Sequence, residues 1–152
     1  MGIKYRIASE IDQGKLVELD TVSSDKVLAG YNQKKKNLLD VEEYFKSGGC
    51  FWVAEKAGNI VGMVAVRFLG GGRGKVKALR VHPDFRRQGI AKQLMDNLEK
   101  YCLEHSIKEL VLGVMSKSVP AVKLYELLGY NKIEEKEVES GVIACYYRKV
   151  LK

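Results

Sequence analysis

The chain has 152 residues, 46% of them hydrophobic and 30% charged, a balance typical of one globular domain with a substantial core and unlike that of a disordered segment. Lysine and arginine exceed aspartate and glutamate by 26 to 19, which gives a net charge of +7 and favours an anionic ligand. The apolar runs are too short to cross a bilayer and no signal peptide is recognisable, so a cytoplasmic protein without membrane segments is expected.

The N-terminal part is expected to form a strand followed by a helix. The strand is expected at 5–8, and the helix places Leu16, Leu19 and Val22 on one side. Residues 23–39 are polar and receive no assignment.

This unassigned stretch contains the one dense basic cluster, Lys34-Lys35-Lys36, which has no aromatic neighbours and is interpreted as a solvated surface. Asp40 is expected to begin a second, short helix, with Glu43 three residues later as its capping-box partner. Gly48-Gly49 is expected to end that helix.

Three strands follow, joined by tight turns. Segments 51–55 and 60–68 are rich in β-branched and aromatic residues, and the turn at 57–59 predicts that they form an antiparallel hairpin. The glycine run at 70–74 is interpreted as a hairpin loop into a third strand at 75–81, because no helix follows it as in a dinucleotide-binding loop.

The second half begins with the clearest helix, predicted over 89–104 from apolar residues at helical spacing. An apolar strand at 109–115 comes next, so the middle of the chain predicts a βαβ unit. Pro120 suits the first turn of a further helix, and strands at 132–139 and 142–150 close the chain. The order predicts an α+β fold, a mixed and mostly antiparallel central sheet flanked by helices, in a single domain over residues 1–152.

Metal and disulfide chemistry are not expected. The cysteines, Cys50, Cys102 and Cys145, are odd in number and far apart, and the chain has only two histidines. No metal is therefore predicted. Cys145 is interpreted as a buried strand residue in preference to an acyl-carrying nucleophile.

The segment Arg86-Arg87-Gln88-Gly89-Ile90-Ala91 joins a strand to the clearest helix. A helix start presents unpaired main-chain N–H groups and the positive end of the helix dipole. Gly89 lets a ligand approach the backbone, Ala91 leaves the next turn clear, and Arg86 and Arg87 add positive charge. The segment is therefore predicted to hold a pyrophosphate.

A second phrase, Leu124-Tyr125-Glu126-Leu127-Leu128-Gly129-Tyr130, lies on the later helix, and Leu79-Arg80-Val81-His82-Pro83-Asp84-Phe85 runs directly into the glycine segment. With an Arg/Gln-x-x-Gly-x-Gly/Ala loop between these two phrases, the chain resembles the GNAT superfamily of N-acetyltransferases. The motifs match from Val76 to about Tyr130, and the strand order extends the resemblance loosely across the chain.

The resemblance implies the acyl-CoA N-acyltransferase fold and direct transfer of an acetyl group from acetyl-CoA to a primary amine in a ternary complex. It implies that main-chain N–H groups from Arg87 to Ala91 hold the coenzyme A pyrophosphate, and that Val81 pairs with the pantetheine arm. The N–H near Leu79 would polarise the thioester carbonyl. Tyr125 would protonate the departing thiolate, since a tyrosine with a pKa near 10 can supply a proton.

Two positions depart from the family pattern, Ser118 and Lys75. Ser118 stands where many members have asparagine, and this serine would cap the helix or bond the pantetheine arm. Tyr125 and Leu79 are thus the predicted catalytic residues. The residues predicted to bind the cofactor are Leu79, Val81, Arg86, Arg87, Gln88, Gly89, Ile90, Ala91, Ser118 and Tyr125.

Several alternatives stay open at the level of sequence. Lys75 occupies the neighbourhood where some members carry a carboxylate base, which leaves Glu55 or a bulk-connected water for that role. A non-catalytic acyl-CoA sensor is the alternative function, and a nucleic-acid-binding domain is disfavoured because the basic residues are scattered. The acceptor is either a small molecule or a peptide, and a homodimer is neither required nor excluded.

One further feature bears on the acceptor. The acidic run over 134–139 is interpreted as a solvated sheet edge, with attraction of a cationic acceptor as the alternative.

Overall fold

The computed structural model describes residues 2–23 and 41–152. Seven strands form one mixed sheet in the order β1-β2-β3-β4-β5-β7-β6, in which only β4 and β5 are parallel neighbours. The strands are β1 (Lys4–Ile7), β2 (Cys50–Lys56), β3 (Asn59–Gly70), β4 (Arg73–Val81), β5 (Glu109–Met115), β6 (Asn131–Glu139) and β7 (Val142–Val150). The α-helices are α1 (Gln13–Ser23), α3 (Val41–Lys46), α4 (Ile90–Glu104) and α5 (Val119–Leu127), with 3₁₀ turns at Glu10–Asp12 and Pro83–Phe85.

The predicted order of strands and helices is confirmed, and local chemistry explains its boundaries. The β2–β3 turn places Ala57 and Gly58 at positive φ, as a two-residue hairpin turn requires. Gly48 at φ 89° ends α3, where its N–H donates to Phe45 and the N–H of Gly49 donates to Tyr44. Asp40 and the Lys34–Lys36 cluster lie outside the described residues.

One core position was predicted wrongly. Leu16 and Leu19 of α1 are buried, but Val22 is 52% exposed and Ser23 is buried in its place. Position 23 is seven residues after Leu16, which is close to two full helical turns, whereas position 22 is rotated away from the sheet.

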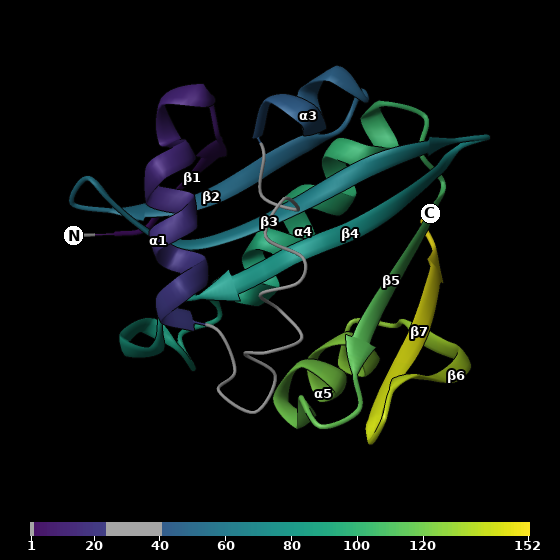
Figure 1. Cartoon of the computed structure of the whole chain (residues 1–152). Helices are drawn as coiled ribbons and strands as arrows, with labels where there is room; N and C mark the ends of the chain where they lie inside the picture. The colour runs from purple at the N-terminus through teal and green to yellow at the C-terminus, as the bar shows by residue number, and fades with distance from the viewer. Residues whose placement is uncertain (1, 24–40) are drawn as a thin grey trace.

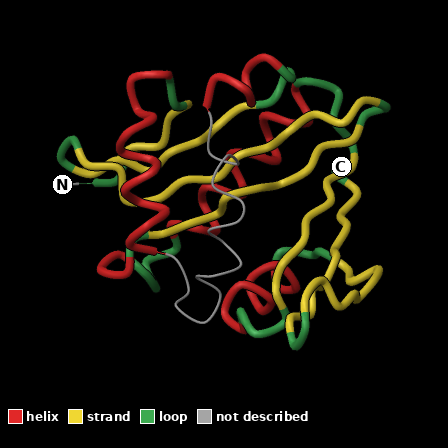
Figure 2. Tube along the Cα trace, in the orientation of Figure 1, coloured by secondary structure: helices red, strands yellow, loops and turns green. Residues whose placement is uncertain are grey.

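Helices cover both faces of the sheet (Figures 1 and 2). α1 and α3 pack on one face, where Leu16, Tyr44 and Met63 belong to one buried cluster. α4 packs on the other face, and Leu98 and Tyr125 belong to the larger cluster there. Alternate residues of the central strands therefore serve two cores, which explains why 61–66 is buried without interruption.

The sheet divides between β4 and β5. These strands pair only where Arg73, Gly74 and Lys75 face residues 109–111, and Figure 1 shows them separating beyond that point. We call the diverging segments, 76–81 and 112–115, the fork, and Lys75 its apex.

α4 rests directly on β3 at Gly62. A Cβ built on Gly62 would lie 2.9 Å from Ile90 Cγ2 and 3.1 Å from Leu94 Cδ1, so a larger residue would displace the first turns of the helix. The absence of a side chain at this position fixes where the N-terminus of α4 stands relative to the fork.

A β-bulge interrupts β4 beside the fork. Arg80 pairs with Met63 and Lys77 pairs with Ala65, so Val64 alone faces the two residues Ala78 and Leu79. Ala78 has φ 57°, a left-handed conformation that is unfavourable for alanine. The backbone is therefore strained at Ala78, and the strand changes direction at Leu79.

Candidate active site

The glycine segment forms the N-terminus of α4 at the open end of the fork. Gly89 is the N-cap residue with φ 78° and ψ 11°, and a Cβ built there meets no atom within 4 Å. Ile90 is 2% exposed, so only its main chain can meet a ligand, while Ala91 is half-buried. The first N–H groups of the helix have no partner within it, which makes this exposed turn a site for an anion.

The two arginines of the segment behave differently. The Arg86 guanidinium donates from Nε to the Val81 carbonyl at 3.3 Å and from Nη2 to the Ser23 carbonyl at 3.2 Å, so it ties the segment to β4 and α1. Arg87 and Gln88 are exposed, and Arg87 has φ 65°. Arg86 is thus bound to carbonyl groups, whereas Arg87 is an exposed residue two positions before Gly89.

The edge of β4 that faces the fork carries the main-chain groups of Leu79 and Val81. The N–H of His82 donates to the Val61 carbonyl at 2.8 Å, so after the bulge the main-chain groups of even-numbered residues turn toward β3 and those of odd-numbered residues turn away. The Leu79 carbonyl accepts from Arg80 and the Val81 carbonyl from Arg86, both side chains rather than β3. This edge therefore offers main-chain groups to an extended ligand.

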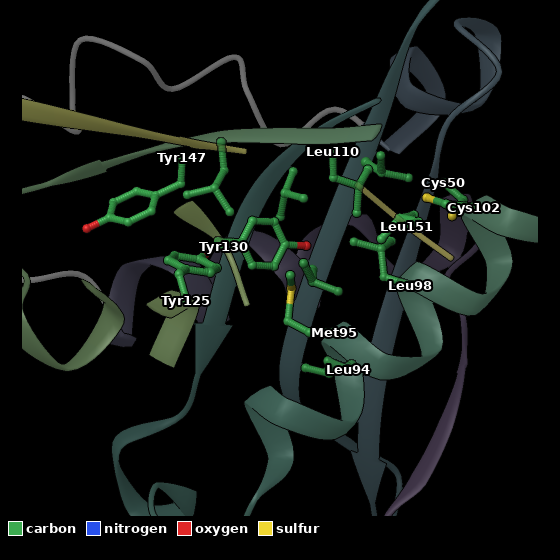
Figure 3. Close-up of a cluster of buried hydrophobic side chains, with 14 of the residues drawn as sticks. Cys50, Leu94, Met95, Leu98, Cys102, Leu110, Tyr125, Tyr130, Tyr147 and Leu151 are labelled. Carbon is green, nitrogen blue, oxygen red and sulfur yellow. The ribbon is translucent and has the colours of Figure 1, made fainter. Parts of the chain in front are cut away.

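Tyr125 of α5 lies in the core on the α4 side of the sheet. It is 7% exposed, and its ring meets the Tyr130 ring edge-on at 5.7 Å between centroids (Figure 3). Burial raises the pKa of Tyr125 to about 12, partly opposed by the charge of Arg80. The hydroxyl therefore stays protonated at neutral pH, as a proton donor must.

A polar trio holds Tyr130 against Tyr125. The Tyr130 hydroxyl donates to Glu99 Oε2 at 2.9 Å, and Lys149 Nζ donates to Glu99 Oε1 at 2.8 Å. The Lys149 ammonium also lies 5.5 Å from the centre of the Tyr130 ring. These contacts join α4, β7 and the end of α5 around Tyr125, a link that the sequence pattern did not indicate.

Two further predictions concern Ser118 and Glu55. Ser118 is the N-cap residue of α5 but makes no side-chain capping hydrogen bond, so the expected cap is wrong and the pantetheine contact stays a prediction. Glu55 accepts from Arg6 Nη2 at 3.1 Å, and Arg6 also binds both oxygens of Asp12. Glu55 is thus engaged in an ion-pair network, and the base is not identified.

The remaining reactive groups do not form a second centre. All three cysteines are free and buried, and burial raises the pKa of the Cys145 thiol, which disfavours its thiolate. In the part of the chain that the structure describes, no group of three or more His, Cys, Asp or Glu side chains gathers, and no helix is long and apolar enough to cross a membrane.

Known proteins share this sequence pattern. The model of the Acetyltransferase (GNAT) family matches residues 17–130. N-acetylaspartate synthetase of Rattus norvegicus is 37% identical over 122 residues, which cover 76% of this chain and 40% of that protein. Human N-acetyltransferase 8 is 32% identical over 103 residues, 63% of this chain and 45% of that protein. The chain therefore spans less than half the length of either relative.

Solved structures share the fold. A GNAT acetyltransferase of Staphylococcus aureus Mu50 superposes with a TM-score of 0.81 at 23% identity, covering 99% of this chain and 100% of that one. The PaiA N-acetyltransferase of Thermoplasma acidophilum, solved in complex with coenzyme A, superposes with a TM-score of 0.82 at 19% identity and covers 99% of both chains. Since the family model covers most of the chain and the fold agrees throughout, the chain belongs to the GNAT family of acetyltransferases.

Proposed function

We propose that the chain transfers an acetyl group from acetyl-CoA to a primary amine, directly and within a ternary complex. The observation that carries this proposal is the fork between β4 and β5 with the Gly89 turn of α4 at its open end. The coenzyme A complex of a protein with the same fold supports the cofactor.

In this proposal, the main-chain N–H groups from Arg87 to Ala91 hold the pyrophosphate at the start of α4. The pantetheine arm extends along β4 and pairs with Val81, where the Arg86 side chain now occupies the carbonyl. Arg86 therefore has to shift or share that carbonyl when the cofactor binds. Gln88 and Ser118 complete the predicted binding residues.

The thioester end of the cofactor would then lie beside the bulge. The N–H of Leu79 polarises the thioester carbonyl and stabilises the oxyanion that forms when the amine attacks. Tyr125 donates its hydroxyl proton to the sulfur as the carbon–sulfur bond breaks, leaving an N-acetylated amine and free coenzyme A. The attacking amine must be neutral, and because Glu55 is held by Arg6, a bulk-connected water takes the amine proton in this proposal.

The acceptor in this proposal is an amine on a small molecule. The name N-acetylaspartate synthetase, carried by relatives at 37% and 39% identity, supports an amino acid as the acceptor. Ribosomal-protein-alanine N-acetyltransferases share the fold at 15% and 19% identity and give weaker support for a peptide.

Release of free thiol from acetyl-CoA, measured with a panel of amines, tests the proposal. We expect turnover with at least one amine, and a fall in kcat of about 100-fold in Tyr125→Phe, far larger than any loss of acetyl-CoA affinity. Tyr101→Phe, which alters a half-buried tyrosine on α4, is the control and should leave kcat unchanged. Binding of acetyl-CoA with no turnover of any amine would instead support a sensor, and an unchanged kcat in Tyr125→Phe would remove Tyr125 as the acid.

A further inference from the structure

Basic side chains form a row along β4 on the face of the sheet that α1 and α3 cover. Gly74 and Val76 face the α4 side, since a Cβ on Gly74 would touch Leu110 and Val76 belongs to the same cluster. The residues between them therefore face the opposite side. Past the bulge, Arg80 returns to that side and binds Asp20 of α1. The β4 basic row consists of Arg73, Lys75, Lys77 and Arg80.

The two ends of the β4 basic row are neutralised within the protein. Arg73 pairs with Glu109 at 3.3 Å, and Arg80 pairs with Asp20 at 3.0 Å. Lys75, between them, forms no ion pair with any residue in the two described ranges. The unneutralised charge of the row thus lies at the apex of the fork.

Cross-strand neighbours add to this charge instead of reducing it. Lys75 stands directly opposite Arg67 of β3, a pairing of like charges that destabilises a sheet. The Arg67 guanidinium lies 5.1 Å from the centre of the Tyr44 ring, and its buried Nε has no hydrogen-bond partner among the described residues. A cost of this kind is tolerated where an anion compensates it.

A third cation lies on the other side of the apex. Lys75 pairs with Val111 of β5, which pairs with Arg148 of β7, so all three share one face. Two strand spacings separate Lys75 from Arg148, a distance of about 10 Å. Arg148 is exposed and forms no ion pair with the part of the chain that the structure describes. A carboxylate on the same face, Glu134, lies on the outermost strand, β6, opposite Tyr146.

These cations lie where the acceptor would meet the cofactor. With the pyrophosphate at Gly89 and the arm along Val81, the thioester at Leu79 points toward the apex. Lys77 is two residues from Leu79 and Lys75 is four, which places Lys75 about 13 Å along the strand. A small molecule on this face can therefore present its amine to the thioester and its other groups to the basic residues.

We infer that the acceptor is a small amine bearing carboxylate groups, and that Lys75 and Arg148 bind those carboxylates at the apex of the fork. This inference rests on the proposed acetyltransferase function and names the substrate class of the same site. Arg148 offers a planar, bidentate donor set and Lys75 a point charge, while Arg67 adds to the local positive potential.

Steady-state kinetics with matched amines tests this inference. L-Aspartate and L-glutamate are compared with L-asparagine and L-glutamine, which have the same shapes without the side-chain charge, and with spermidine as a cationic amine. We expect kcat/KM to be at least about 10-fold higher for an acidic amino acid than for its amide, the contribution of one charge-assisted contact. A neutral or cationic amine preferred over both acidic ones would overturn the inference.

Two variants test whether Lys75 and Arg148 bind the carboxylates of the acceptor. Lys75→Gln and Arg148→Gln should each lower kcat/KM for the acidic amino acid by about 10-fold through KM, with a smaller loss for the amide. Lys100→Gln, on the exposed side of α4, is the control and should change neither value. Variants that lower both substrates equally, or that change nothing, would contradict the assignment.

A binding measurement keeps the test independent of turnover. Succinate and N-acetyl-L-aspartate, titrated into the coenzyme A-bound protein, should bind the wild type and bind the Lys75 and Arg148 variants more weakly. If coenzyme A binds but neither anion does, the acceptor inference fails and the proposed function stands. If acetyl-CoA itself does not bind, the proposed function fails.

Discussion

At the scale of single residues, burial keeps the hydroxyl of Tyr125, the proposed proton donor, protonated. Its pKa of about 12 lies above that of an ordinary thiol, about 8.5, so complete proton transfer to a free thiolate would be uphill. The proton that Tyr125 donates is therefore expected to move late, after a hydrogen bond to the sulfur has strengthened as charge develops there. The neighbouring charge of Arg80 lowers the pKa of Tyr125 and brings it closer to a useful range.

This pKa predicts the shape of the pH profile. An acid must carry its proton, and a raised pKa extends the protonated range to higher pH, so kcat should rise to a plateau and not fall between about pH 8 and pH 10. Measuring kcat across this range with saturating substrates checks the expectation. A descending limb in this interval that disappears in Tyr125→Phe would show that Tyr125 titrates lower than its burial implies.

At the scale of elements, the packing of α4 on β3 positions the helix N-terminus that is proposed to hold the pyrophosphate. Gly62 lies beneath the first turn of the helix, whereas Gly74 packs against Val66 of β3 and Leu110 of β5. Both glycines allow close packing, but only Gly62 is near the turn that would hold the cofactor. The two positions therefore separate loss of packing from loss of the site.

Gly62→Ala should push Ile90 and the N-terminus of α4 away from the sheet and weaken acetyl-CoA binding by about 10-fold, together with a loss of stability of about 1–3 kcal/mol. Gly74→Ala, whose Cβ would lie 2.9 Å from Val66 and 3.0 Å from Leu110, should cost similar stability. Its acetyl-CoA affinity should nevertheless stay within about two-fold of the wild type. Chemical denaturation and titration calorimetry measure both quantities, and equal losses of affinity in the two variants would contradict the account.

The element scale also shows what sequence can predict. Helical spacing, the glycine turns and Pro120 were sufficient to place the described strands and helices, because these signals are local. The bulge at Ala78 was not predictable, since it depends on the register with Val64 and uses alanine where glycine is usual. The direction of Arg86 was also missed, because its carbonyl partners come from α1 and β4.

Basic residues that are scattered along the chain are partly gathered by the fold. Arg73, Lys75 and Lys77 alternate along the strand, a period-two pattern that already placed them on one face. Their proximity to Arg67 and Arg148 depends on strand order, which put β7 beside β5. The sequence pattern alone therefore indicates the β4 basic row, but the proximity of Lys75 to Arg67 and Arg148 requires the structure.

At the scale of the whole molecule, chain order assembles the site from distant segments. The βαβ unit supplies the fork and the helix N-terminus, α5 supplies Tyr125, and β7 returns between β5 and β6 to add Arg148. In the proposed function, the α4 side of the sheet and the fork would hold the cofactor, and the α1 side would hold the acceptor. This division agrees with a ternary complex in which both are bound before transfer.

The most direct test of this account is calorimetric titration of acetyl-CoA into the wild type, Gly89→Leu and Gly58→Leu, with coenzyme A and ATP as comparators. Gly89 and Gly58 have φ of 78° and 82°, and a Cβ at either meets no atom within 4 Å, so both substitutions carry the same kind of backbone strain. We predict micromolar binding to the wild type and to Gly58→Leu, and its loss in Gly89→Leu. No binding to the wild type, or equal affinity in Gly89→Leu, would contradict the cofactor site at the start of α4.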